Sequence, residues 1–155
     1  MANEGVAHML EIAAWLQAQS VGTIGRTIIV NAEPDRVGGA ASTGPEVFLL
    51  EEQPPQSAFV YGSSGPAVQV FRFRVNTRST EPTADMIAAS SRARNKARDA
   101  YIALCKVTNR SLSSTRSGST GVWLSALPES QPFLAGVDSR KRTVFTFVVR
   151  AERNG

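Results

Sequence analysis

The sequence contains very few of the residues on which most catalytic and metal sites depend. Its 155 residues include one cysteine, Cys105, and one histidine, His8. A single cysteine excludes an internal disulfide and cannot build a cysteine-based metal site alone. No apolar run approaches the roughly 20 residues that span a bilayer, and the first residues lack the basic start and cleavage site of a signal peptide. These absences predict a soluble, reduced protein without membrane contact.

A catalytic or cofactor site is equally difficult to find. His8 falls in the first turns of a predicted helix with no nucleophile beside it, which indicates a surface or packing histidine. Cys105 ends an apolar helical stripe and is predicted to pack in the core. The neighbours Glu51 and Glu52 would point to opposite faces of a strand, so they do not form an acid and base pair. We therefore predict no catalytic residue, no metal site, no cofactor and no enzymatic activity.

Charge is unevenly distributed along the chain, although the net value is only +4. Residues 1–66 carry two arginines against seven acids, whereas residues 67–155 carry 15 basic groups against six acids. A basic half can bind phosphates, and it can equally face the acidic half of a neighbouring copy in a head-to-tail contact. A scattered, solvated surface is the remaining interpretation.

The first half of the chain predicts one helix and three strands. Met9, Ile12, Ala13 and Leu16 form an apolar stripe with Glu11 off it, so residues 4–19 should be an amphipathic helix. Turn residues and prolines then separate further segments. The predicted strands cover residues 27–35, 45–55 and 67–78, with a mobile loop at 38–45. In the third strand Phe71 and Phe73 alternate with Arg72 and Arg74, which places them on opposite faces.

The second half predicts a long helix, a polar segment and two strands. The helix should begin near Pro82 and run to Cys105. Residues 108–121 are rich in Ser and Thr and should be a mobile loop or hairpin tip. Strands are expected at 122–127 and 142–151, with a basic turn at 136–142 before the last one. The order predicts a single α+β domain over residues 1–155, with a mostly antiparallel sheet covered by two helices.

Nucleic-acid binding is the main alternative from a different class of function. Six cations could line one basic surface and attract phosphates: Arg72, Arg74, Arg92, Arg94, Lys96 and Arg98. Phe71 and Phe73 favour core packing over base stacking, because they lie opposite Arg72 and Arg74. No zinc-finger or RNA-recognition signature occurs in the sequence. A small hydrolase is a more distant alternative.

Several segments in succession resemble the minor capsid and tail terminator family of bacteriophages. The resemblance rests on "NAEPDRVGG", "VFLLEEQPP", "VQVFRFRV", "ARDAYIALC" and the closing "PFLAGVDSRKRTVFTFVVRA", and it covers most of the chain. It implies a structural virion protein assembled in the bacterial host cytoplasm. Six copies would form a ring on the last ring of the tail tube, stop its growth and receive the neck or stopper connector. Another neck or head-completion protein is the alternative within the virion.

This resemblance and the charge asymmetry together suggest interface residues. The turn cations Arg140, Lys141 and Arg142 are expected to be exposed and to face a neighbouring copy. The strand residues Arg72, Arg74, Glu51 and Glu52 are candidates for the same kind of contact. Passage of the genome through the ring implies transient DNA contact with inward loops.

Overall fold

The computed structural model describes residues 4–52, 56–58, 68–82 and 85–154 as two α-helices, one short 3-10 helix and an eight-stranded sheet. The helices are α1 (Glu4–Ala18) and α2 (Met86–Cys105), with η1 at Val37–Gly39. The strands are β1 (Ile28–Val30), β2 (Glu46–Glu51), β3 (Gln56–Ala58), β4 (Val68–Arg78), β5 (Thr108–Ser114), β6 (Ser119–Pro128), β7 (Phe133–Val137) and β8 (Thr143–Asn154). The predicted α+β class is confirmed.

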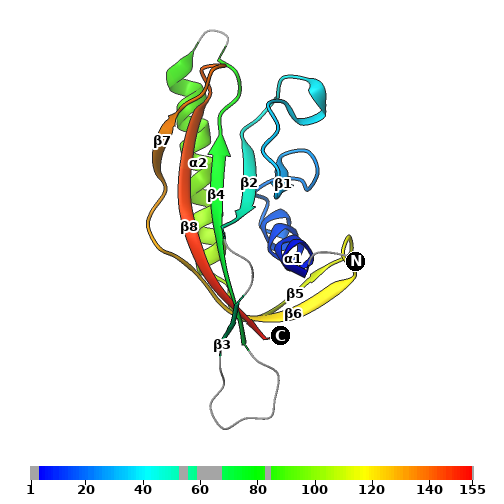
Figure 1. The fold of residues 1–155 in the computed structure, drawn as a ribbon. Coiled ribbons are helices and arrows are strands. Elements are labelled where there is room, and N and C mark those ends of the chain that lie inside the picture. The colour runs from blue at the N-terminus through cyan, green and yellow to red at the C-terminus, as the bar shows by residue number, and fades with distance from the viewer. Residues whose placement is uncertain (1–3, 53–55, 59–67, 83–84, 155) are drawn as a thin grey trace.

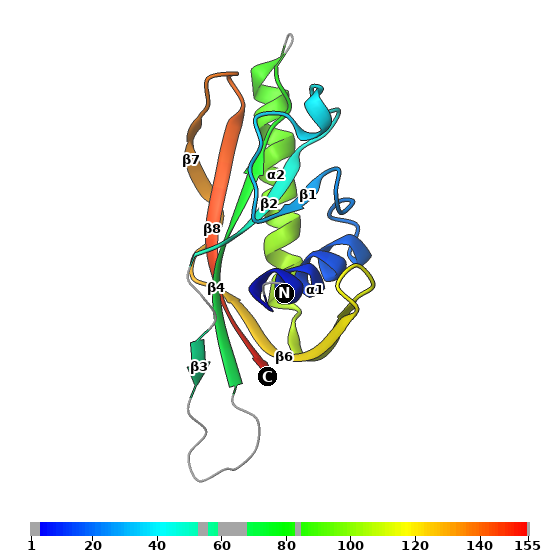
Figure 2. The same cartoon turned by 45° about the vertical axis from the view of Figure 1, so that its right-hand side comes forward.

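Two long antiparallel strands, β4 and β8, form the centre of the sheet. They pair from Val68 opposite Asn154 to Arg78 opposite Val144. Each has two shorter partners along its outer side: β2 and β3 pair with β4, whereas β6 and β7 pair with β8. Among the strand pairs of the sheet only β1 and β2 run parallel, so the predicted antiparallel bias is confirmed for the described residues. Figure 2 shows both helices on the same side of β4 and β8.

The core lies between this helical side and the sheet. Phe71, Phe73, Phe147 and Val149 are buried there, while Arg72 and Arg74 lie on the opposite face, as their alternation predicts. Below α1, the hairpin of β5 and β6 curves away from the sheet centre and closes the core at that end (Figure 1). Leu112 and Trp123 of this hairpin join the same buried cluster.

Helix α2 packs closely against the sheet because its buried face consists mainly of alanine. Its buried residues are Ala89, Ala93, Ala97, Ala100, Ala103 and Leu104. The helix begins later than predicted, since the Asp85 carboxylate accepts a hydrogen bond from the Ala88 backbone N–H at 3.0 Å and forms the N-cap. Cys105 is exposed rather than buried, so the prediction that it packs in the core is wrong. Neither helix, over the residues described, is long and apolar enough to cross a membrane.

Two buried ion pairs connect elements that are far apart in the sequence. Arg153 on β8 binds Glu11 on α1, and the Trp123 indole N–H donates to the same carboxylate at 2.9 Å. On the other side of the sheet centre, Arg78 of β4 binds Glu46 of β2 at 2.9 Å. The sequence pattern placed Glu11 off the apolar stripe, yet its side chain is fully buried. A charge buried in this way is tolerated because several donors surround it.

Two segments for which the sequence predicted no strand contain one. Most of residues 108–121 belongs to β5 and β6, so only a tight turn at 115–118 remains of the predicted loop or hairpin tip. The segment before the basic turn forms β7 instead of entering the turn directly. The segment at 38–45 contains the end of η1 followed by residues without a strand or helix, as the loop prediction requires.

Candidate functional site

The predicted basic turn is held by an ion-pair cluster instead of projecting freely. The cluster joins the loop after β1, the end of β4 and the turn between β7 and β8, and it consists of Asp35, Arg36, Glu81, Asp138, Arg140 and Arg142. Arg142 is only 4 % exposed, so the expectation of an exposed cation is wrong there. Arg140 binds Asp35 and Glu81. Lys141, by contrast, is exposed.

The arginines of this cluster keep its carboxylates ionised. The hydrogen bond from Arg140, supported by Arg142, lowers the pKa of Asp35 to about 2, against a smaller opposing effect of burial. The hydrogen bond from Arg36 likewise lowers the pKa of Glu81. Burial raises the pKa of Asp138, but hydrogen bonds from the Arg142 backbone and side chain outweigh it and leave the pKa below its usual value. The cluster therefore ties three loops together electrostatically at neutral pH.

Acid should weaken this cluster. A carboxylate with a depressed pKa in the folded state adds stability above its unfolded pKa, and that contribution disappears as pH falls through the folded value. For Asp35 the window lies between about 4, the usual aspartate value, and the folded value of about 2. We expect the melting temperature of wild type to fall more steeply across this window than that of Asp35→Asn. Parallel curves in a pH series of thermal melts would contradict the assignment.

The cations of the turn should differ in their effect on stability. Arg142→Ala removes hydrogen bonds to Asp35 and Asp138 from a buried guanidinium, and we expect a loss of about 2 kcal/mol. Lys141→Ala should stay within about 0.5 kcal/mol, because Lys141 is exposed and forms no ion pair with a described residue. Urea denaturation of both variants measures the difference. Equal losses of unfolding free energy in the two variants would contradict the ion pairs assigned to Arg142.

The candidate residues Arg72, Arg74 and Glu52 come together on the open face of the sheet, opposite the helices. Arg72 binds Glu129 at 3.1 Å, and Arg74 binds Glu52 at 2.5 Å. The hydrogen bond from Arg72 lowers the pKa of Glu129. Glu51, at the end of β2, forms no ion pair with a described residue.

A third ion pair continues this open face along β8. Arg150 is directly opposite Arg72 in the strand register, and it pairs with Glu152 at 3.1 Å. Each arginine of the face therefore has a carboxylate partner, and the face is almost balanced in charge.

The cations of α2 are in a different position. Arg92, Arg94, Lys96 and Arg98 lie on the helix, and none forms an ion pair within the described parts of the chain. Because α2 covers the face opposite Arg72 and Arg74, the six cations do not form the single basic surface that the nucleic-acid alternative requires. The chain has two separate surfaces instead: the open face of the sheet, where positive and negative charges are almost balanced, and the basic surface of α2.

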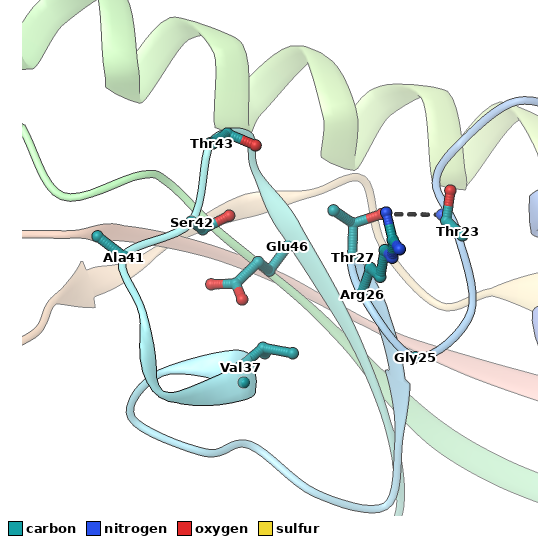
Figure 3. A pocket seen from close by; sticks show the side chains of 10 residues that line it. Thr23, Gly25, Arg26, Thr27, Val37, Ala41, Ser42, Thr43 and Glu46 are labelled. Carbon is teal, nitrogen blue, oxygen red and sulfur yellow. Dashed lines mark hydrogen bonds between the residues drawn. The ribbon is translucent and has the colours of Figure 1, made fainter.

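No catalytic arrangement accompanies these surfaces among the described residues. His8 is a packing histidine, with its ring edge-on to Phe71 at 5.0 Å between centroids. No group of three or more His, Cys, Asp or Glu suitable for a metal ion occurs in the part of the chain that the structure describes. A hollow of about 310 Å³ lies beside η1, and Thr23, Arg26 and Glu46 contribute to its lining (Figure 3). The carboxylate of Glu46 is already engaged by the buried Arg78.

Comparisons with known proteins give a fold likeness only. No protein-family model matches the sequence, and no curated protein matches it either. Seven solved chains match the structure. One of them belongs to the "Virion of native gene transfer agent (GTA) particle", with a TM-score of 0.52 and 19% sequence identity over 93% of this chain and 94% of that chain. At this identity the match shows that the two chains share a fold over nearly their whole lengths.

Proposed function

We propose that this chain is a structural protein of a phage-like virion and acts there as a tail terminator. Copies of the chain, six by the family resemblance, form a ring that caps the tail tube and presents a new surface to the neck connector. The observation that carries the proposal is the fold likeness to a chain of a gene transfer agent virion, which extends over 93% of this chain. The sequence resemblance supplies the finer assignment to the tail terminator.

The distribution of charge supports an assembly role. Eight of the acids enter ion pairs inside the described chain. Those of Asp35, Glu81 and Asp138 hold loops in fixed positions. Fixed loops suit a protein that acts by shape, because a partner then meets a preformed surface. The mechanism is steric: binding to the terminal tube ring blocks further addition. No covalent step is required of any residue.

Tail length provides the test. When the gene for this chain is disrupted, we expect the particles to have tails of uncontrolled length and heads without attached tails. Negative-stain electron microscopy measures both. Supplying the intact gene in trans should restore the normal length. Tails of normal length that fail to join heads would instead support the alternative of a neck or head-completion protein. Normal particles would overturn both virion assignments.

Nucleic-acid binding remains a second candidate because Arg92, Arg94, Lys96 and Arg98 of α2 form no ion pair with a described residue. Phosphate binding by such a surface weakens steeply with salt. Fluorescence anisotropy with a labelled DNA duplex at two salt concentrations tests it. Salt-sensitive binding that is lost in Arg94→Ser/Arg98→Ser would favour this candidate, whereas unchanged anisotropy would remove it.

A further inference from the structure

Strand β7 is a free and largely apolar edge of the sheet. It pairs with β8 on one side, and no described strand lies on its other side. Phe133, Leu134 and Val137 of β7 are 55 to 57 % exposed, and its five residues include no charge. The edge strand β5 differs, because it exposes polar residues at its start, Arg110 among them. Charges, proline, short length and β-bulges are the usual protection of a free edge. β7 is short and its pairing is irregular between Leu134 and Gly136, but its exposed apolar side chains give it the character of a surface that is covered in an assembly.

A groove with a basic wall adjoins this edge. The groove has a volume of about 670 Å³ and lies between α2 and the segment that enters β7, with Arg94, Arg98, Tyr101 and Pro132 in its lining. Leu134 is close to it, since its strand partner Phe145 packs on the alanine face of α2. Arg94 and Arg98 form no ion pair with any described residue. The apolar edge and the unpaired cations therefore make one continuous surface.

A complementary charge lies toward the opposite edge of the sheet. In the part of the sheet that contains β7, the strand order is β7, β8, β4, β2 and β1, and Figure 1 shows β7 and β1 on opposite sides of the central pair. Glu51 ends β2, next to β1, and enters no ion pair within the described residues. Glu33 follows β1, but its carboxylate lies over the open face of the sheet, where it accepts hydrogen bonds of 3.4 Å from the Asn76 amide of β4. Each copy thus has unpaired cations beside β7 and, near the other edge, the Glu51 carboxylate without a counter-charge among the described residues.

We propose that β7 and the adjoining groove of α2 form the docking surface for a second copy of this chain, which brings Glu51 against Arg94 and Arg98. The contact joins different surfaces of the two copies, so repetition closes a ring when the rotation between copies allows it. The inference rests on the proposed function for the ring. It adds which surface each copy uses, and it places Leu134 at the apolar centre of the contact.

The test compares two leucines of similar exposure in the full chain. Leu134→Lys should raise the dissociation constant of the assembly by about 30-fold or more, because it places a charge at the centre of the contact. Leu127→Lys is the control: Leu127 is 59 % exposed but lies on the open face, opposite Arg150. Sedimentation velocity over a concentration series measures both. Equal behaviour of the two variants, or a wild type that stays monomeric throughout, would overturn the inference.

A charge exchange tests the orientation of the two copies. Arg94→Glu/Arg98→Glu should weaken assembly about 10-fold, and adding Glu51→Arg to the same chain should restore much of it. Failure to restore would overturn the assigned pairing. These outcomes are separable from the proposed function, because tail length in particles is measured independently of self-association in solution.

Discussion

Replacing Arg153 with Met should lower the free energy of unfolding by about 3 to 5 kcal/mol, because the Glu11 carboxylate would remain buried without its counter-charge. The two groups are joined by two hydrogen bonds, from Nε to Oε1 and from Nη2 to Oε2, each 3.0 Å long. Glu11 has no exposed surface with which to recover hydration. Chemical denaturation followed by circular dichroism measures the loss.

Two further variants separate the buried charge from the general loss of an arginine. Arg150→Met alters the same strand, but Arg150 is exposed and its pair with Glu152 lies at the surface, so the change should stay below about 1 kcal/mol. Adding Glu11→Gln to Arg153→Met should recover much of the lost stability. The amide introduced by this substitution keeps an acceptor for the Trp123 indole and carries no charge. A double variant as unstable as Arg153→Met alone would contradict the explanation.

The same ion pair explains why position 121 is a glycine. A Cβ atom at this position would collide with the Arg153 guanidinium, whose position is fixed by Glu11. The glycine therefore lets β6 pass close to a side chain that anchors α1. The Glu11–Arg153 ion pair, Gly121 and Trp123 together attach α1 to β8. Glu11 and Arg153 are 142 positions apart in the sequence.

That separation explains why the sequence did not reveal the pair. Glu11 lies off the stripe formed by Met9, Ile12 and Leu16, and local periodicity alone makes it a solvent-facing residue. The hairpin of β5 and β6 covers this side of α1, and a helical pattern contains no information about such a distant element. A buried carboxylate becomes predictable only when its donors are known.

Local periodicity was sufficient to predict an element and its buried face where the element is long and only one face is buried. The alternation in β4 correctly separated Phe71 and Phe73 from Arg72 and Arg74, and α1 was located to within one residue at its end. It failed for β7, since its exposed apolar residues do not alternate with polar ones. It also failed for β5, where only Leu112 and Ser114 are buried.

The candidate interface residues show the same limit. Charge counting along the chain identified an acidic and a basic half, but it could not tell which charges are already paired. Arg142 of the predicted turn is buried against Asp35 and Asp138, whereas Arg94 and Arg98 remain unpaired among the described residues. A charge contributes to recognition of a partner mainly when the fold leaves it available, and this depends on tertiary contacts.

Replacing Phe147 with Ala should lower the free energy of unfolding by about 3 to 5 kcal/mol through loss of burial and creation of a cavity. Phe147 has no exposed surface and belongs to the main core cluster. Its ring meets Tyr101 of α2 edge-on, with centroids 5.9 Å apart. Residues of both helices and of the hairpin share this cluster, so they cannot all move inward to fill the space.

Phe145 provides the matched comparison two residues earlier on the same face of β8. It is 9 % exposed and packs in a small separate cluster with Ala93 and Ala97. Phe145→Ala should therefore cost less, about 2 kcal/mol, because its site is at the margin of the core, where solvent can reach part of the space that the ring leaves. Urea denaturation of the two variants under one set of conditions gives the difference. If Phe145→Ala proved the more destabilising, the β7 edge would be part of the main core, and Leu134 would then be a residue that supports the fold instead of one that contacts a partner.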